Sequence, residues 1–169
     1  MSLSVVGVDE DGWIMKELRT AEPSIPGWRL LVADNVDDDA PAHAWLLYTK
    51  ENYVGECVLV YDDLRSDLFR TQGLRSARPL PVNRRGIALF QHRDYRGQML
   101  FTDEAIPDLR ARGFNDTASS LLISGVTAWE LFEHVDYSGR SVLLDSRRYG
   151  DPAAIGLAND TVSSLRPVP

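Results

Sequence analysis

Phe90-Gln-His-Arg-Asp-Tyr95-Arg-Gly97 and Phe132-Glu-His-Val-Asp-Tyr137-Ser-Gly139 are two copies of one pattern: an aromatic residue, four residues, a second aromatic, any residue and a glycine. A third copy, Tyr48-Thr-Lys-Glu-Asn-Tyr53-Val-Gly55, keeps the register, because the leading aromatics at 48, 90 and 132 are 42 residues apart each time. Each glycine precedes a short apolar stretch closed by aspartate, which is typical of a β-strand. Since glycine adopts backbone shapes that are closed to residues with a Cβ, the pattern predicts a tightly folded β-hairpin.

A second pattern lies farther along the same repeats. Asn115-Asp-Thr-Ala-Ser-Ser120 and Asn159-Asp-Thr-Val-Ser-Ser164 are nearly identical polar loops, each followed by another β-prone stretch. Each repeat therefore predicts about four antiparallel strands, which suggests a Greek key. Residues 105–112 and 151–156 favour only short helical turns, so the expected class is all-β.

The N-terminal part contains a degenerate copy of the repeat. Gly12 lies 43 residues before Gly55 and precedes an expected strand, but the aromatics before it are missing. The acidic stretch 34–39 stands about where the Asn-Asp loop belongs. Four repeats form two pairs, with a proline-containing linker at 79–85, so we expect two domains, residues 1–83 and 84–169.

Composition and charge restrict the function. A hydrophobic share of 44% in 169 residues argues against disorder, and a net charge of −7 with a pI of about 4.9 disfavours nucleic-acid binding. No apolar run approaches the roughly 18–20 residues of a membrane span, so no membrane association is expected. A lone cysteine, Cys57, excludes an internal disulfide and a cysteine-based zinc site. The first residues have no basic or long apolar segment, so we expect no signal peptide, and cytoplasmic and exported locations both stay open.

The two patterns together resemble the βγ-crystallin superfamily, and more particularly its microbial calcium-binding members. Residues 86–169 carry both patterns twice in order, whereas residues 1–85 match only in part. The resemblance implies two β-sandwich domains of two Greek keys each, with two calcium ions between the paired repeats of the C-terminal domain. In the N-terminal domain, Gln72-Gly-Leu-Arg-Ser-Ala77 stands in place of the Asn-Asp loop and has no acidic residue, which disfavours calcium there.

The resemblance also implies the ligands. In each loop the second residue gives its side chain and the third its carbonyl to one ion, while the fifth sends a hydroxyl to the other ion. A further carbonyl comes from the residue after the first aromatic. The implied ligands are Asp116, Thr117, Ser119, Asp160, Thr161, Ser163, Gln91 and Glu133. All offer oxygen, which calcium prefers, and one carboxylate per site predicts dissociation constants of about 10⁻⁵ to 10⁻³ M. Asn115 and Asn159 are expected to brace their loops.

Other functions stay open on these residues. The loops could be polar turns without an ion, or, as Asn-x-Thr, glycosylation acceptors. A protein-interaction module resembling the inhibitor-like or toxin-like proteins of this fold is the main alternative, with calcium incidental, and carbohydrate binding through exposed aromatics is a third. No nucleophile, phosphate-binding or dinucleotide motif is present, so no enzyme is expected.

Several single residues have structural interpretations. His92 and His134 occupy the same place in two repeats, which the fold itself explains, and His43 is expected on the surface. Cys57 is expected to be a buried thiol, and Trp45 and Trp129 to be core residues. Sixteen of the 18 basic residues are arginine, which hints at a GC-rich bacterial genome.

Overall fold

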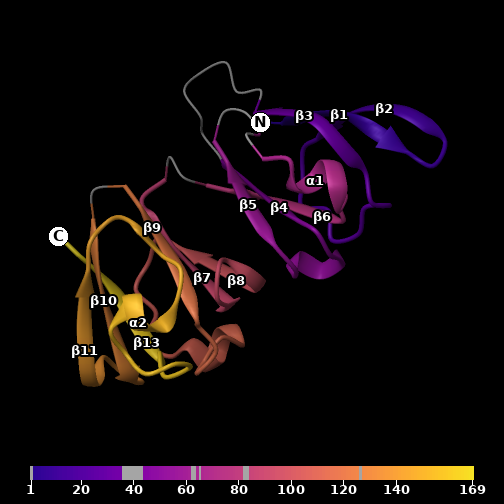
Figure 1. Cartoon of the computed structure of the whole chain (residues 1–169). Coiled ribbons are helices and arrows are strands. Elements are labelled where there is room, and N and C mark those ends of the chain that lie inside the picture. Colours follow the sequence, from indigo (N-terminus) through magenta and orange to yellow (C-terminus); the bar gives the residue numbers. More distant parts are fainter. Residues whose placement is uncertain (1, 36–43, 62–63, 65, 82–83, 126) are drawn as a thin grey trace. The chain divides into compact units, whose positions relative to one another are not determined.

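The computed structural model describes residues 2–35, 44–61, 64, 66–81, 84–125 and 127–169, and the chain divides into two compact units. Unit 1 is Met1–Asn83 and unit 2 is Arg84–Pro169. Both are built almost entirely from antiparallel β-strands (Figure 1). Among the described residues, no helix is long and apolar enough to cross a membrane. The predicted all-β fold with two Greek-key domains is confirmed.

Unit 2 is a sandwich of two sheets (Figure 1). The first has the order β12-β9-β7-β8, with bounds Arg148–Tyr149, Ser120–Ser124, Gly86–His92 and Arg96–Thr102. The second has the order β11-β10-β13, with bounds Ser138–Leu144, Ala128–His134 and Ser164–Val168. The predicted helical turns are the 3-10 helix Leu109–Arg112 and α2 (Pro152–Ile155).

The two Greek keys of unit 2 interlock, because each completes the sheet of the other. Strand β12 belongs to the second key but pairs with β9 of the first sheet. In return Ile106, from the first key, forms an isolated bridge with Leu165 in β13. Alternate residues of the central strands, such as Leu89 and Leu131, then face one core and are fully buried. The loops that precede β9 and β13 come together as a consequence of this pairing.

Unit 1 repeats the architecture with two three-stranded sheets. One has the order β2-β1-β3, with bounds Gly12–Leu18, Leu3–Asp9 and Arg29–Asn35. The other has the order β5-β4-β6, with bounds Cys57–Val60, Ala44–Tyr48 and Ser76–Leu80. Short helices occur at Glu51–Tyr53 and at α1 (Leu68–Thr71), which buries Phe69 and which the sequence did not predict.

The folded hairpins are present in three of the four repeats. The two aromatics of each pattern pack edge to face, with ring centroids 5.7, 5.5 and 5.7 Å apart. Gly139 has a φ of +80°, and a Cβ there would lie 2.7 Å from Cδ2 of His134. The glycine is therefore required both by its backbone conformation and by the close approach of the histidine ring. This contact gives His134 a place in the hairpin, in line with its structural interpretation.

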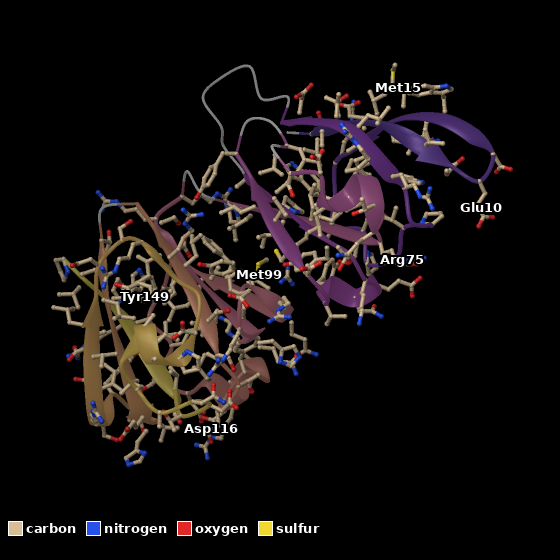
Figure 2. All side chains as sticks on the ribbon, in the orientation of Figure 1. Glu10, Met15, Arg75, Met99, Asp116 and Tyr149 are labelled. Atoms are coloured by element: carbon tan, nitrogen blue, oxygen red, sulfur yellow. The ribbon has the colours of Figure 1, made fainter. Side chains whose placement is uncertain are left out.

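The first repeat forms an ordinary hairpin instead. Asp9 pairs directly with Gly12, so the turn contains only two residues and does not fold back over its sheet. Val6 stands where the other repeats have an aromatic. As a result Trp13 and Met15 are 77% and 78% exposed on the outer face of β2, and Figure 2 shows Met15 pointing away from the sheet.

Three predictions about single residues have clear outcomes. Trp45 and Trp129 are 0% and 1% exposed, which confirms them as core residues. Cys57 is partly exposed, so the buried-thiol prediction is wrong. The reason is that Cys57 begins β5, the outer strand of its sheet. His43 lies outside the described residues.

Candidate metal centre

The two polar loops of unit 2 lie side by side because their middle residues enter one core. Ala118 and Val162, the fourth residues of the loops, are 2% and 1% exposed in the shared core cluster. The backbone N–H of Asp116 donates to the carbonyl oxygen of Val162 at 3.2 Å, which joins the loops directly. The apolar fourth residue thus fixes where the polar residues on either side of it point.

Each loop turns at its aspartate. Asp116 and Asp160 have φ values of 49° and 56°, in the left-handed region that aspartate tolerates better than most residues. The side-chain amide of Asn115 donates to Oδ2 of Asp116 at 2.6 Å, and Asn159 does the same for Asp160 at 2.6 Å. The asparagines therefore brace the aspartates and leave both Oδ1 atoms to face the neighbouring loop.

The two Oδ1 atoms receive hydroxyl groups from the opposite loop. Ser119 Oγ donates to Oδ1 of Asp160 at 3.1 Å, across 41 residues of sequence. Ser163 Oγ donates to Oδ1 of Asp116 at 3.2 Å, across 47 residues. Both serines are 6% exposed. The result is a pair of symmetric clusters, each with one carboxylate and one hydroxyl, that tie the Greek keys together.

The remaining expected ligands contribute differently. Thr117 and Thr161 donate their hydroxyls within their own loops, to carbonyls of Asn115 and Ala158, each at 2.8 Å. The backbone carbonyls of both threonines remain the expected ligand atoms. Gln91 and Glu133 fall at register shifts, between the paired residues 90 and 92 and the paired residues 132 and 134. Their backbones are thus outside the regular ladder, but among the described residues no hydrogen bond joins them to the Ser–Asp clusters.

The last serine of each loop has a role that the sequence reasoning missed. Ser164 is fully buried, donates its hydroxyl to the carbonyl of His134 at 2.6 Å and accepts from the backbone N–H of Tyr137 at 3.1 Å. Ser120 bonds the first hairpin of unit 2 in the same way, at 2.6 and 3.1 Å. The Ser-Ser pair in both loops was the available signal, since the family resemblance assigns only the first of the two serines as an expected ligand and leaves the second without a role.

The same contacts correct the alignment of the unit 1 loop. Ser76 donates to the carbonyl of Lys50 at 2.6 Å and accepts from the N–H of Tyr53 at 3.0 Å, so it corresponds to Ser120 and not to Ser119. Arg75 N–H donates to the carbonyl of Tyr48 at 2.9 Å, as Ser119 does to that of Phe90 at 3.0 Å. The sequence alignment was therefore one residue out.

With the corrected register, an arginine and an amide replace the hydroxyl and the carboxylate in unit 1. Arg75 occupies the place of Ser119 and Gln72 the place of Asp116. The partner loop is not the acidic stretch 34–39 either. Asp34 lies in β3, opposite Ser4, and 36–39 lie outside the described residues. Instead Trp28 N–H donates to the carbonyl of Leu74 at 3.1 Å, the contact that Asp116 makes with Val162.

An arginine covers the folded hairpin in two repeats. Arg166 lies over the rings of Phe132 and Tyr137, at 5.1 and 5.4 Å from their centroids. Its guanidinium also donates to Oε2 of Glu130 at 2.7 Å, and this hydrogen bond holds the pKa of Glu130 below its usual value. In unit 1 Arg78 lies over Tyr48 and Tyr53 in the same manner. Both arginines are thus engaged in contacts with the hairpin aromatics.

The chemistry of the Ser–Asp clusters fits a hard cation. Two oxygens bound to one calcium ion at roughly 2.4 Å and at right angles lie about 3.4 Å apart, close to the observed separations. Oδ1 of Asn115 is also buried without a hydrogen-bond partner among the described residues, which leaves an oxygen acceptor beside the cluster. No group of three or more His, Cys, Asp or Glu residues gathers anywhere in the described part of the chain. Carbonyl and hydroxyl oxygens would therefore have to provide most of the ligands.

The fold and the paired loops define a class of protein: two Greek-key units, one of which has matched polar loops. Comparison with known proteins gives the family. The beta/gamma crystallin family model matches residues 86–168. Gamma-crystallin D of Rattus norvegicus is 35% identical over 133 residues, which cover 73% of this chain and 74% of the rat protein. Gamma-crystallin D of Homo sapiens is 35% identical with the same coverage. The chain belongs to the beta/gamma crystallin family.

A solved structure extends the likeness to the whole chain. Geodin, a beta-gamma crystallin from Geodia cydonium, matches with a TM-score of 0.76 over 98% of this chain and 99% of its own. The sequence identity is 22%, so this match concerns the fold alone. The degenerate unit 1 is included in it.

Proposed function

We propose that this protein binds two calcium ions in unit 2 and that the ions clamp its two Greek keys together. The observation that carries the proposal is the crossed pair of contacts, Ser119 with Asp160 and Ser163 with Asp116, at 3.1 and 3.2 Å. One ion in each cluster would replace a single hydrogen bond by two metal–oxygen bonds to opposite loops. Thr117, Thr161, Gln91 and Glu133 would complete the two sites with carbonyl oxygens.

Weak to moderate affinity follows from the ligand set. Each cluster holds one carboxylate, and calcium affinity rises with ligand charge and with rigidity. The bracing asparagines and the buried fourth residues supply rigidity but no charge. At a calcium concentration 100 times the dissociation constant, each site adds about 2.7 kcal/mol to the free energy of unfolding. Occupancy therefore stabilises the fold, and the proposed role is structural and not enzymatic.

The proposal is tested by thermal unfolding of the full chain, in chelator and in a calcium series up to several millimolar. With both sites occupied at 100 times the dissociation constant, the two contributions add to about 5.4 kcal/mol, and we expect the midpoint of unit 2 to rise by roughly 20–40 °C. Asp116→Ala and Asp160→Ala should each remove part of the rise, and the double variant all of it. Asp103→Ala, an exposed aspartate outside the loops, is the matched control, and magnesium controls for ionic strength. A wild-type midpoint that is the same in chelator and in calcium would refute the proposal.

One observation favours the alternative of a protein-interaction module. Trp13 and Met15 are exposed because the first hairpin does not fold over its sheet, and exposed large apolar side chains mark interaction surfaces. The two candidates differ in the calcium experiment. Calcium-independent stability, together with a protein complex that Trp13→Ser weakens, would favour the interaction module.

A further inference from the structure

A cavity of about 380 Å³ lies in unit 1, between the β1–β2 hairpin, the loop at residues 26–29 and the loop at residues 71–75. Asp9 and Glu10 come from the β1–β2 turn, Arg29 from the start of β3, and Gln72 and Arg75 from the segment between α1 and β6. Figure 2 shows Glu10 at the turn and Arg75 on the segment that leads into β6. The wall is mostly polar and charged, unlike the apolar lining of a typical ligand pocket.

The cavity occupies the position of the paired loops of unit 2. The contact of Trp28 with Leu74 marks the same junction that Asp116 and Val162 form there, at 3.1 and 3.2 Å. Arg75 stands at the place of the crossing serine. Where unit 2 has carboxylate and hydroxyl oxygens at this position, unit 1 adds arginine side chains to the acidic residues of its first hairpin, so the cavity presents both signs of charge.

Opposite charges face this cavity without pairing. Among the described residues, neither Asp9 nor Glu10 forms an ion pair with Arg29 or Arg75. Oδ1 of Asp9 accepts from the N–H of Asp11 at 2.9 Å, which fixes that carboxylate to its own turn.

The arginine side of the cavity is positioned by a glycine. A Cβ at Gly27 would lie 3.3 Å from Nη2 of Arg75, so the guanidinium lies close against this glycine. The acidic residues come from the β1–β2 turn and the arginines from β3 and the segment before β6, so the two kinds of charge reach the cavity from different elements.

We propose that this cavity binds a small zwitterion of the α-amino-acid class. Its carboxylate pairs with Arg29 and Arg75, whose planar forks suit a carboxylate. Its ammonium group pairs with Asp9 and Glu10. A simple anion would be attracted by the arginines and repelled by the acids, and a simple cation the reverse, so only a ligand with both charges gains on both walls. The exposure of both arginines places the affinity in the millimolar range. No residue of the proposed calcium loops lines the cavity, so this proposal stands or falls independently of calcium.

The test is an NMR titration of the ¹⁵N-labelled full chain at constant ionic strength, in a buffer without carboxylate or phosphate. Three probes are compared: L-glutamine, N-acetyl-L-glutamine, which lacks the ammonium group, and L-glutaminamide, which lacks the carboxylate. We expect saturable shifts at the amides of Glu10, Gln72 and Arg75 with L-glutamine, and at least tenfold weaker binding of the other two probes. Equal binding of L-glutamine and N-acetyl-L-glutamine would overturn the zwitterion assignment.

Variants locate the site. Arg75→Gln and Glu10→Gln should each weaken L-glutamine binding about tenfold. Arg70→Gln is the matched control, because Arg70 is an exposed arginine in the same unit that pairs with Asp67 outside the cavity. The thermal midpoint of each variant is recorded to show that it folds. Wild-type affinity in Arg75→Gln and Glu10→Gln would place any binding elsewhere and refute the proposal.

Discussion

Replacing Ser164 by alanine should destabilise unit 2 far more than the loss of one oxygen atom suggests. Its buried hydroxyl satisfies two backbone groups at once, the carbonyl of His134 at 2.6 Å and the N–H of Tyr137 at 3.1 Å. Alanine leaves both without a partner, and an unsatisfied buried group costs about 1–3 kcal/mol. We therefore expect the free energy of unfolding to fall by about 3 kcal/mol, a large part of the stability of a small domain.

The assay is urea unfolding of the full chain in chelator, so that calcium contributes nothing. Ser138→Ala is the matched control, since its exposed hydroxyl donates only to the carbonyl of Val135 at 2.7 Å. The control should change the free energy by less than about 0.5 kcal/mol. A loss no larger in Ser164→Ala than in the control would refute the reasoning, because it would show that the hairpin satisfies its backbone without the serine.

Two further predictions concern the same hairpin. Gly139→Ala should lower the free energy of unfolding by about 2 kcal/mol, because alanine is strained at a φ of +80° and its Cβ would meet the ring of His134. Adding His134→Ala to the same chain should recover only the part that is due to the clash. Urea unfolding of the single and double variants measures both parts. The Glu130–Arg166 pair should stabilise unit 2 by about 1 kcal/mol above the usual carboxyl pKa of 4.5 and lose this as pH falls through the lowered pKa of folded Glu130. Arg166→Gln should abolish that part of the pH dependence, which lies below the ordinary carboxyl pKa of 4.5, in acid unfolding curves. An unchanged curve would contradict it.

The sequence predicts the hairpins well because their determinants are local. Two aromatics and a glycine within eight residues specify the edge-to-face ring pair and the left-handed turn, and the hairpin forms wherever all three are present. The first repeat fits the same rule after the fact, because its aromatics are missing and its turn is an ordinary one. Burial of Trp45 and Trp129 was likewise predicted from their matching places in two repeats, and both side chains are buried.

The candidate site depends on contacts that no local pattern encodes. The residues identify oxygen-rich loops, but the pairing of Ser119 with Asp160 joins positions 41 residues apart and depends on how two Greek keys interlock. Only the resemblance to a family suggested that crossing. The exposure of Cys57 likewise depends on its strand being the outer one of a sheet.

The tertiary structure alone decided what unit 1 carries at the equivalent position. Glycines and turns of unequal length make the sequence alignment of its loop ambiguous by one residue, and a shift of one residue exchanges a serine for an arginine. The backbone contacts of Arg75 and Ser76 remove that ambiguity. The sequence by itself determined the repeat, the hairpins and the oxygen-bearing loops, because these rest on interactions between near neighbours. Which charges face each other across a loop pair was decided only by packing, because packing brings together residues that the chain keeps far apart.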